Sequence, residues 1–161
     1  TMNSADQGVF PMDTAFKRRW NFEYLGINDN EDEIKGIGKL TLAGMDEPIE
    51  WNRLRKAINA KMSSGDFKIN EDKLMGPFFL SKKVIASDEN GEIIDREKFI
   101  KAFKSKVIMY LYEDAVKQGK HRFFDGCPDT GKYSSVCDAF KTMGLAIFGP
   151  TFKESFYDKE D

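Results

Sequence analysis

The chain has 161 residues, a length that fits one compact domain or a small domain with an attached segment. Its net charge of −2 at pH 7 argues against a dedicated nucleic-acid-binding domain, which usually carries a basic face. The absence of any apolar run of about 18 residues excludes a transmembrane helix from this sequence. Two cysteines are too few for a disulfide scaffold, which favours a reducing compartment, so we expect a cytoplasmic protein.

Residues 1–26 predict the end of a strand, a loop, a short helix and a further strand. Asp13 is a candidate cap for the short helix, and residues 20–24 alternate aromatic and polar side chains as a half-buried strand does. Residues 27–48 predict a charged linker. Within it, residues 34–42 alternate with a period of two and favour a short strand, which two glycines weaken.

The rest of the chain predicts helices. Pro48 suits the first turn of a helix over residues 49–62, whose apolar residues lie on one face: Trp51, Leu54, Ile58 and Met62. The longest helix is expected over residues 95–117, and Gly119 marks its end. Its apolar stripe comprises Phe99, Phe103, Val107, Tyr110, Leu111 and Ala115. A further helix is expected from the capping residue Ser134 to Gly144, and residues 151–161 form a polar tail. The fold class predicted is mainly α with a small β portion.

Asn3 and the pair Arg18 and Arg19 are the candidate catalytic residues. An amide at the end of a strand can align a water molecule with a terminal phosphate, and a guanidinium can neutralise the charge that develops during phosphoryl transfer. The alternative for Asn3 is a turn-forming residue. The alternatives for the arginines are a solvated basic patch, or salt bridges with Asp13 or Glu23.

The segments that hold these residues resemble a known family. Met-Asn-Ser-Ala-Asp at residues 2–6 and Ala-Phe-Lys-Arg-Arg-Trp at residues 15–20 are similar to the second half of a ring-forming AAA+ nucleotide hydrolase. They are most similar to the McrB type, the motor subunit of restriction systems that cut modified DNA. The sequence departs from that pattern at Ser4, Lys17 and residues 7–8. A second, weaker resemblance covers the Gly-Pro-Phe-Phe segment at residues 76–79 and the helix after Phe103.

The resemblance implies a role for each part of the chain. Asn3 would sense the terminal phosphate, Arg18 or Arg19 would reach the nucleotide of the neighbouring subunit, and Asp6 and Asp13 belong to the signature. Residues 1–26 would be the edge of the AAA+ α/β sheet, and residues 49–150 would be the helical lid. The full-length parent would bind ATP or GTP with Mg²⁺, assemble into a homo-oligomeric ring, expected to be a hexamer, and act on DNA through an McrC-like nuclease.

In that family the phosphate-gripping motifs precede the Asn. We therefore expect this chain alone to hold no cofactor or metal and to be inactive. Residues 126–133 fit the phosphate-loop pattern except that Tyr133 replaces the Ser or Thr that binds magnesium, so we predict a plain loop between helices. His121 and the two cysteines lack the spacing of a zinc site. The alternative function is a helical module that binds protein or nucleic acid and has no motor activity.

Overall fold

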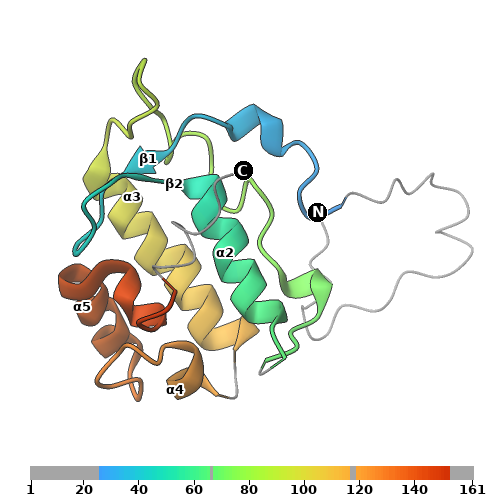
Figure 1. The fold of residues 1–161 in the computed structure, drawn as a ribbon, viewed down its shortest axis with the longest axis vertical. Coiled ribbons are helices and arrows are strands. Elements are labelled where there is room, and N and C mark those ends of the chain that lie inside the picture. The colour runs from blue at the N-terminus through green and yellow to red at the C-terminus, as the bar shows by residue number, and fades with distance from the viewer. Residues whose placement is uncertain (1–25, 66, 117–118, 153–161) are drawn as a thin grey trace, which may run out of the picture.

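The computed structural model describes residues 26–65, 67–116 and 119–152, and in this part the chain is mainly helical with a small antiparallel sheet, as predicted (Figure 1). Both α2 and α3 start beside the sheet and run away from it (Figure 1). The helices α4 and α5 lie toward the ends of α2 and α3 that are remote from the sheet. In chain order the elements are η1 (Glu31–Ile34), β1 (Lys39–Leu40), β2 (Ile49–Glu50), α2 (Trp51–Ser63), η2 (Glu71–Lys73), α3 (Arg96–Ala102), η3 (Phe103–Ile108), η4 (Leu111–Ala115), α4 (Lys120–Phe123), α5 (Tyr133–Met143) and η5 (Gly144–Phe148).

The strand predicted over residues 34–42 is much shorter than expected. Within this stretch only Lys39–Leu40 forms a strand, β1. It pairs with β2 through Lys39 opposite Glu50 and Leu40 opposite Ile49. Gly36 and Gly38 have φ values of 78° and 77°, a left-handed backbone conformation that interrupts a strand. The glycines therefore confine the sheet to two residues on each strand.

Helix α2 confirms the predicted apolar face, because Trp51, Leu54, Ile58 and Met62 are all fully buried. The helix begins at Trp51 rather than at Ile49, since Ile49 and Glu50 are held in the sheet as β2. The Trp51 indole N–H donates to the carbonyl oxygen of Pro77 at 3.2 Å, and its ring meets the edge of Phe99 from α3 at 6.4 Å between centroids. These contacts join the starts of α2 and α3.

The longest predicted helix is also present. Asp95 caps α3 by accepting a hydrogen bond from the backbone N–H of Lys98 at 3.0 Å. The helix then continues through η3 and η4, which are π-helical, to Ala115, and its apolar stripe is buried except for the half-buried Tyr110. Phe103 stacks on Phe140 of α5 at 4.8 Å between centroids, which packs α5 against this helix.

Two details of the sequence prediction are wrong. Gly119, with a φ of 87°, precedes α4 instead of ending the long helix, so His121 lies inside a helix. Ser134 lies in the first turn of α5, and the residue before that helix is the extended Lys132. In the Gly-Pro-Phe-Phe segment, Phe79 packs against Tyr110 at 5.1 Å between centroids, whereas Phe78 is 40% exposed. Phe79 of that pair therefore packs on the long helix.

Gly144 brings the end of α5 against the backbone near β1. Its φ of 57° and ψ of −130° suit glycine alone, and a Cβ atom there would overlap the carbonyl oxygen of Ala43. We expect Gly144→Ala to lower the free energy of unfolding by about 2 kcal/mol or more. Urea unfolding would measure this loss. Gly65→Ala is the matched control because its Cβ would meet no atom within 4 Å, and equal stabilities of the two variants would contradict the prediction.

Candidate functional site

The five residues singled out in the sequence, Asn3, Asp6, Asp13, Arg18 and Arg19, all lie outside the described residues. The described residues form a pocket at the C-terminal end of α2 and a buried polar cluster nearer the N-terminal end of that helix.

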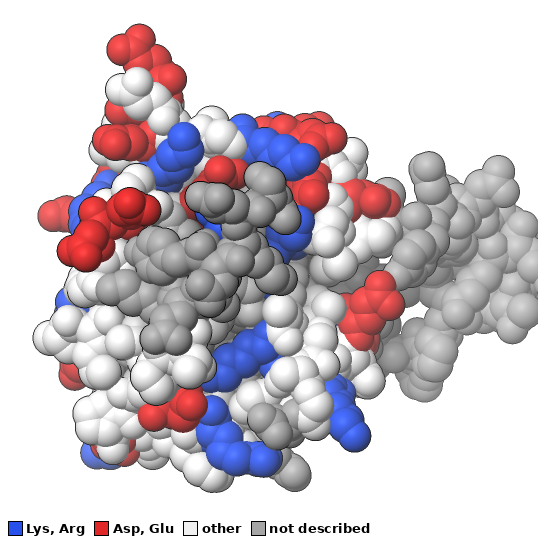
Figure 2. All heavy atoms as spheres, in the orientation of Figure 1, with Lys and Arg blue, Asp and Glu red and all other residues white. Residues whose placement is uncertain are grey.

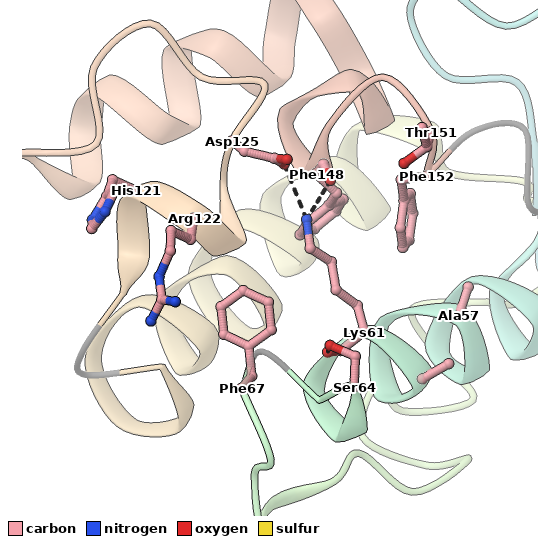
Figure 3. A pocket seen from close by; sticks show the side chains of 11 residues that line it. Ala57, Lys61, Ser64, Phe67, His121, Arg122, Asp125, Phe148, Thr151 and Phe152 are labelled. Atoms are coloured by element: carbon pink, nitrogen blue, oxygen red, sulfur yellow. Dashed lines mark hydrogen bonds and ion pairs between the residues drawn. The ribbon is translucent and has the colours of Figure 1, made fainter.

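The pocket has a volume of about 630 Å³ and lies between α2, α4 and the segment that follows η5 (Figure 3). Lys61 and Ser64 reach it from the end of α2, and Phe67 follows them in the chain. The remaining walls include His121 and Arg122 from α4, Phe148 from η5, and Phe152. Aromatic rings and basic groups from separate parts of the chain thus share one cavity.

Lys61 closes one side of the pocket as a structural cation. Its ammonium group donates to the carbonyl oxygen of Phe123 at 2.7 Å. It also donates to the carbonyl oxygen of Phe148 and forms an ion pair with Asp125 at 3.1 Å (Figure 3). Phe123 and Phe148 end α4 and η5, where carbonyl groups have no partner within their own helix. Since an ammonium group has three N–H donors, these acceptors use all of them.

Arg122 lies at the mouth of the pocket, with its guanidinium 5.8 Å from the centroid of the Phe67 ring. Its side chain and that of His121 are exposed. Within the part of the chain that the structure describes, Arg122 forms no ion pair with an acidic side chain. The mouth therefore presents a guanidinium beside an aromatic ring.

The second polar cluster is centred on Arg55, which is fully buried on α2. Its guanidinium donates to the side-chain oxygens of Asn52 (2.6 Å) and Asn28 (3.0 Å), to the carbonyl oxygen of Met75 (3.0 Å), and to Glu31 (3.3 Å). The cluster ties the segment that follows residue 25 to α2 and to the turn at Met75. No buried side-chain nitrogen or oxygen among the described residues is left without a hydrogen bond.

Asn59 extends this cluster by one helical turn. Its side-chain amide donates to the carbonyl oxygen of Met75 at 2.8 Å, and its side-chain oxygen accepts from the Met75 N–H at 2.8 Å. Asn52, Arg55 and Asn59 repeat at three-to-four spacing beside the apolar stripe of α2, which places them on one face. This polar spacing is the sequence signal that identifies the cluster. The spacing of the apolar residues alone does not reveal the cluster.

The charges of the cluster shift the pKa values of its members. Burial alone would raise the pKa of Glu31, but hydrogen bonds from Asn52 and Lys56 and the positive charges of Lys56 and Arg55 hold it below its ordinary value. Burial lowers the pKa of Arg55, and the negative charge of Glu31 opposes this effect. An arginine titrates so far above neutral pH that Arg55 stays charged. The ion pair is thus present at neutral pH.

The lowered pKa of Glu31 predicts an acid-sensitive contribution to stability. A carboxylate with a depressed pKa in the folded state stabilises the fold above its unfolded pKa, and that contribution is lost as the pH falls through the folded pKa. We expect Glu31→Gln to be less stable than the parent chain at about pH 6, with a smaller difference at about pH 3. Urea unfolding at both pH values tests this, and a difference that does not shrink on acidification would contradict it.

The other candidate sites of the sequence analysis have a plain structural interpretation. Residues 126–132 lie in the loop between α4 and α5, as predicted, and the element that comes just before the loop is the helix α4. Burial and the nearby charge of Asp125 raise the pKa of the Cys127 thiol to about 11, which makes it a poor nucleophile.

In residues 26–152, apart from the gaps, no three His, Cys, Asp or Glu side chains are grouped as metal ligands would be. The same residues contain no helix long and apolar enough to cross a membrane.

Comparison with known proteins gives one informative similarity. The chain matches no family model, and no solved structure matches it. It is 41% identical over 119 residues to the type II restriction enzyme BsuMI component YdiS of Bacillus subtilis (strain 168). The match covers 73% of this chain and 30% of that protein, so the chain spans about a third of the length of its relative. The chain is therefore a homologue of part of a restriction-enzyme component.

Proposed function

We propose that this chain is the C-terminal part of an AAA+ nucleotide-hydrolysing motor in an McrB-like DNA restriction system. The observation that carries the proposal is the 41% identity to a restriction-enzyme component. It is supported by the segments at residues 2–6 and 15–20, which resemble the McrB-type signature. The mainly helical unit that follows them suits the lid of such a motor.

In this proposal the chemistry belongs to the first 25 residues. Asn3 aligns the attacking water with the terminal phosphate of ATP or GTP, and Arg18 or Arg19 stabilises the transition state at the nucleotide of the neighbouring subunit. Bound Mg²⁺ would neutralise phosphate charge, and its ligands would come from parts of the parent other than the described residues. Asp6 and Asp13 would hold the loops that carry Asn3 and the arginines.

The helical unit would contribute a rigid lid. Arg55 fixes the segment from Asn28 to Glu31 against α2, so the chain that leads out of residues 1–25 meets the helices at a fixed point. Lys61 likewise fixes α4 and η5 to the end of α2. Nucleotide binding by the parent can then move this unit as one body relative to the rest of the motor.

The test compares the full-length parent protein with the 161-residue chain. The parent should hydrolyse ATP or GTP with Mg²⁺ and should form a nucleotide-dependent ring, measured by light scattering. The 161-residue chain should hydrolyse neither nucleotide and should stay monomeric or weakly associated. A parent that binds no nucleotide and does not assemble would contradict the proposal and would favour a helical interaction module.

A further inference from the structure

The pocket beside α4 has two chemically different parts. Its inner walls include Phe148 and Phe152, which are buried, and Phe67, which is half-buried. Its mouth holds His121 and Arg122, which are exposed. The cavity of about 630 Å³ is within the size range of pockets that bind compact ligands, and its lining is divided between apolar and polar residues.

The charges inside the pocket leave a net positive mouth. Asp125 is the one acidic residue among those that line it, and its carboxylate is paired with Lys61 at 3.1 Å. The charges of Lys61 and Asp125 cancel each other. The guanidinium of Arg122, next to the Phe67 ring, is then the charged group that remains. A guanidinium binds a carboxylate through two parallel hydrogen bonds, and the neighbouring ring offers a surface on which another ring can pack.

We propose that this pocket binds an aromatic side chain that lies next to a carboxylate in another polypeptide. The ring would pack against the phenylalanine walls, and the carboxylate would pair with Arg122. Aromatic anchors in pockets and arginine partners carry much of the binding energy at protein interfaces. This site goes beyond the proposed function, because nucleotide hydrolysis would use residues 1–25 and needs no partner in this pocket.

A protein partner fits the surface better than nucleic acid does. Figure 2 shows acidic side chains along the projecting loop at residues 88–92, and acidic and basic side chains mixed over the rest of that face. The chain as a whole carries a net charge of −2. Tight binding of nucleic acid requires several cations that each neutralise a phosphate, whereas one guanidinium suffices for one carboxylate.

The experiment uses nuclear magnetic resonance on the ¹⁵N-labelled 161-residue chain. The probe is acetyl-Asp-Phe-amide, and the matched neutral probe is acetyl-Asn-Phe-amide. We expect the acidic probe to shift the amide signals of Phe67, Arg122 and Phe152, and to bind at least about threefold more tightly than the neutral probe. Equal affinities for the two probes, or shifts confined to residues away from the pocket, would overturn the proposal.

Two variants test whether Arg122 causes the tighter binding of the acidic probe. Arg122→Gln should bind both probes equally, whereas Arg122→Lys should keep part of the preference for the acidic probe. Lys141→Gln, an exposed change on α5, is the control and should keep the full preference. A further titration, of the unchanged chain with a thymidine decanucleotide, should leave the amide signals of the pocket residues unshifted. Stronger binding of that oligonucleotide at Arg122 would overturn the protein-partner assignment. None of these results depends on nucleotide hydrolysis, so failure here is distinguishable from failure of the motor proposal.

Discussion

Arg55→Met is expected to lower the free energy of unfolding of the 161-residue chain by about 3–5 kcal/mol, the usual loss when one partner of a buried charged network is removed. Methionine fills a similar length of space but donates no hydrogen bond. Asn28, Asn52 and Glu31 would each lose a donor that the fully buried guanidinium supplies. Urea unfolding followed by far-UV circular dichroism measures the difference.

Two companion variants separate this effect from a general loss of charge on α2. Arg55→Lys keeps the positive charge but loses the forked geometry, so its stability should fall between those of the parent chain and Arg55→Met. Arg53→Met changes an exposed arginine on the same helix and should cost less than about 1 kcal/mol. If Arg55→Met were as stable as Arg53→Met, the cluster would contribute no net stability.

The second large effect concerns catalysis by the full-length parent. Arg19→Ala should lower kcat by roughly 10³-fold or more, the usual contribution of an arginine supplied in trans to phosphoryl transfer. In the proposed motor, nucleotide affinity should change little, because groups other than Arg19 would hold the phosphates. Asn3→Ala should likewise slow hydrolysis more than it weakens binding. Steady-state hydrolysis and equilibrium nucleotide binding measure the two quantities, and a variant that loses both equally would indicate a structural role.

The periodicity of apolar residues is what allowed the helices to be predicted. Trp51, Leu54, Ile58 and Met62 repeat at the helical spacing and are all fully buried, and the stripe that starts at Phe99 is buried except for Tyr110. The strand over residues 34–42 was overestimated because a two-residue period does not report backbone conformation. Left-handed glycines at positions 36 and 38 decide where the pairing stops.

The pocket and the buried cluster depend on contacts that periodicity does not encode. Lys61 meets Phe123 and Phe148 across separations of 62 and 87 residues, and such pairs are set only when the helices pack. In the sequence, Arg55 has the residue type of an exposed charged side chain. Its burial follows from the acceptors that Asn28 and Met75 bring to it from other segments.

In the proposed motor, one arginine of the pair Arg18 and Arg19 acts on the nucleotide of a neighbouring subunit, and a mixing experiment on the full-length parent tests this role most directly. One partner carries Arg19→Ala and the other carries a defective phosphate loop, so each is inactive alone. At a mixed interface, an intact nucleotide site faces an intact arginine. The proposed function predicts that the mixture recovers measurable nucleotide hydrolysis. A mixture that assembles into rings but stays as inactive as its separate components would contradict it.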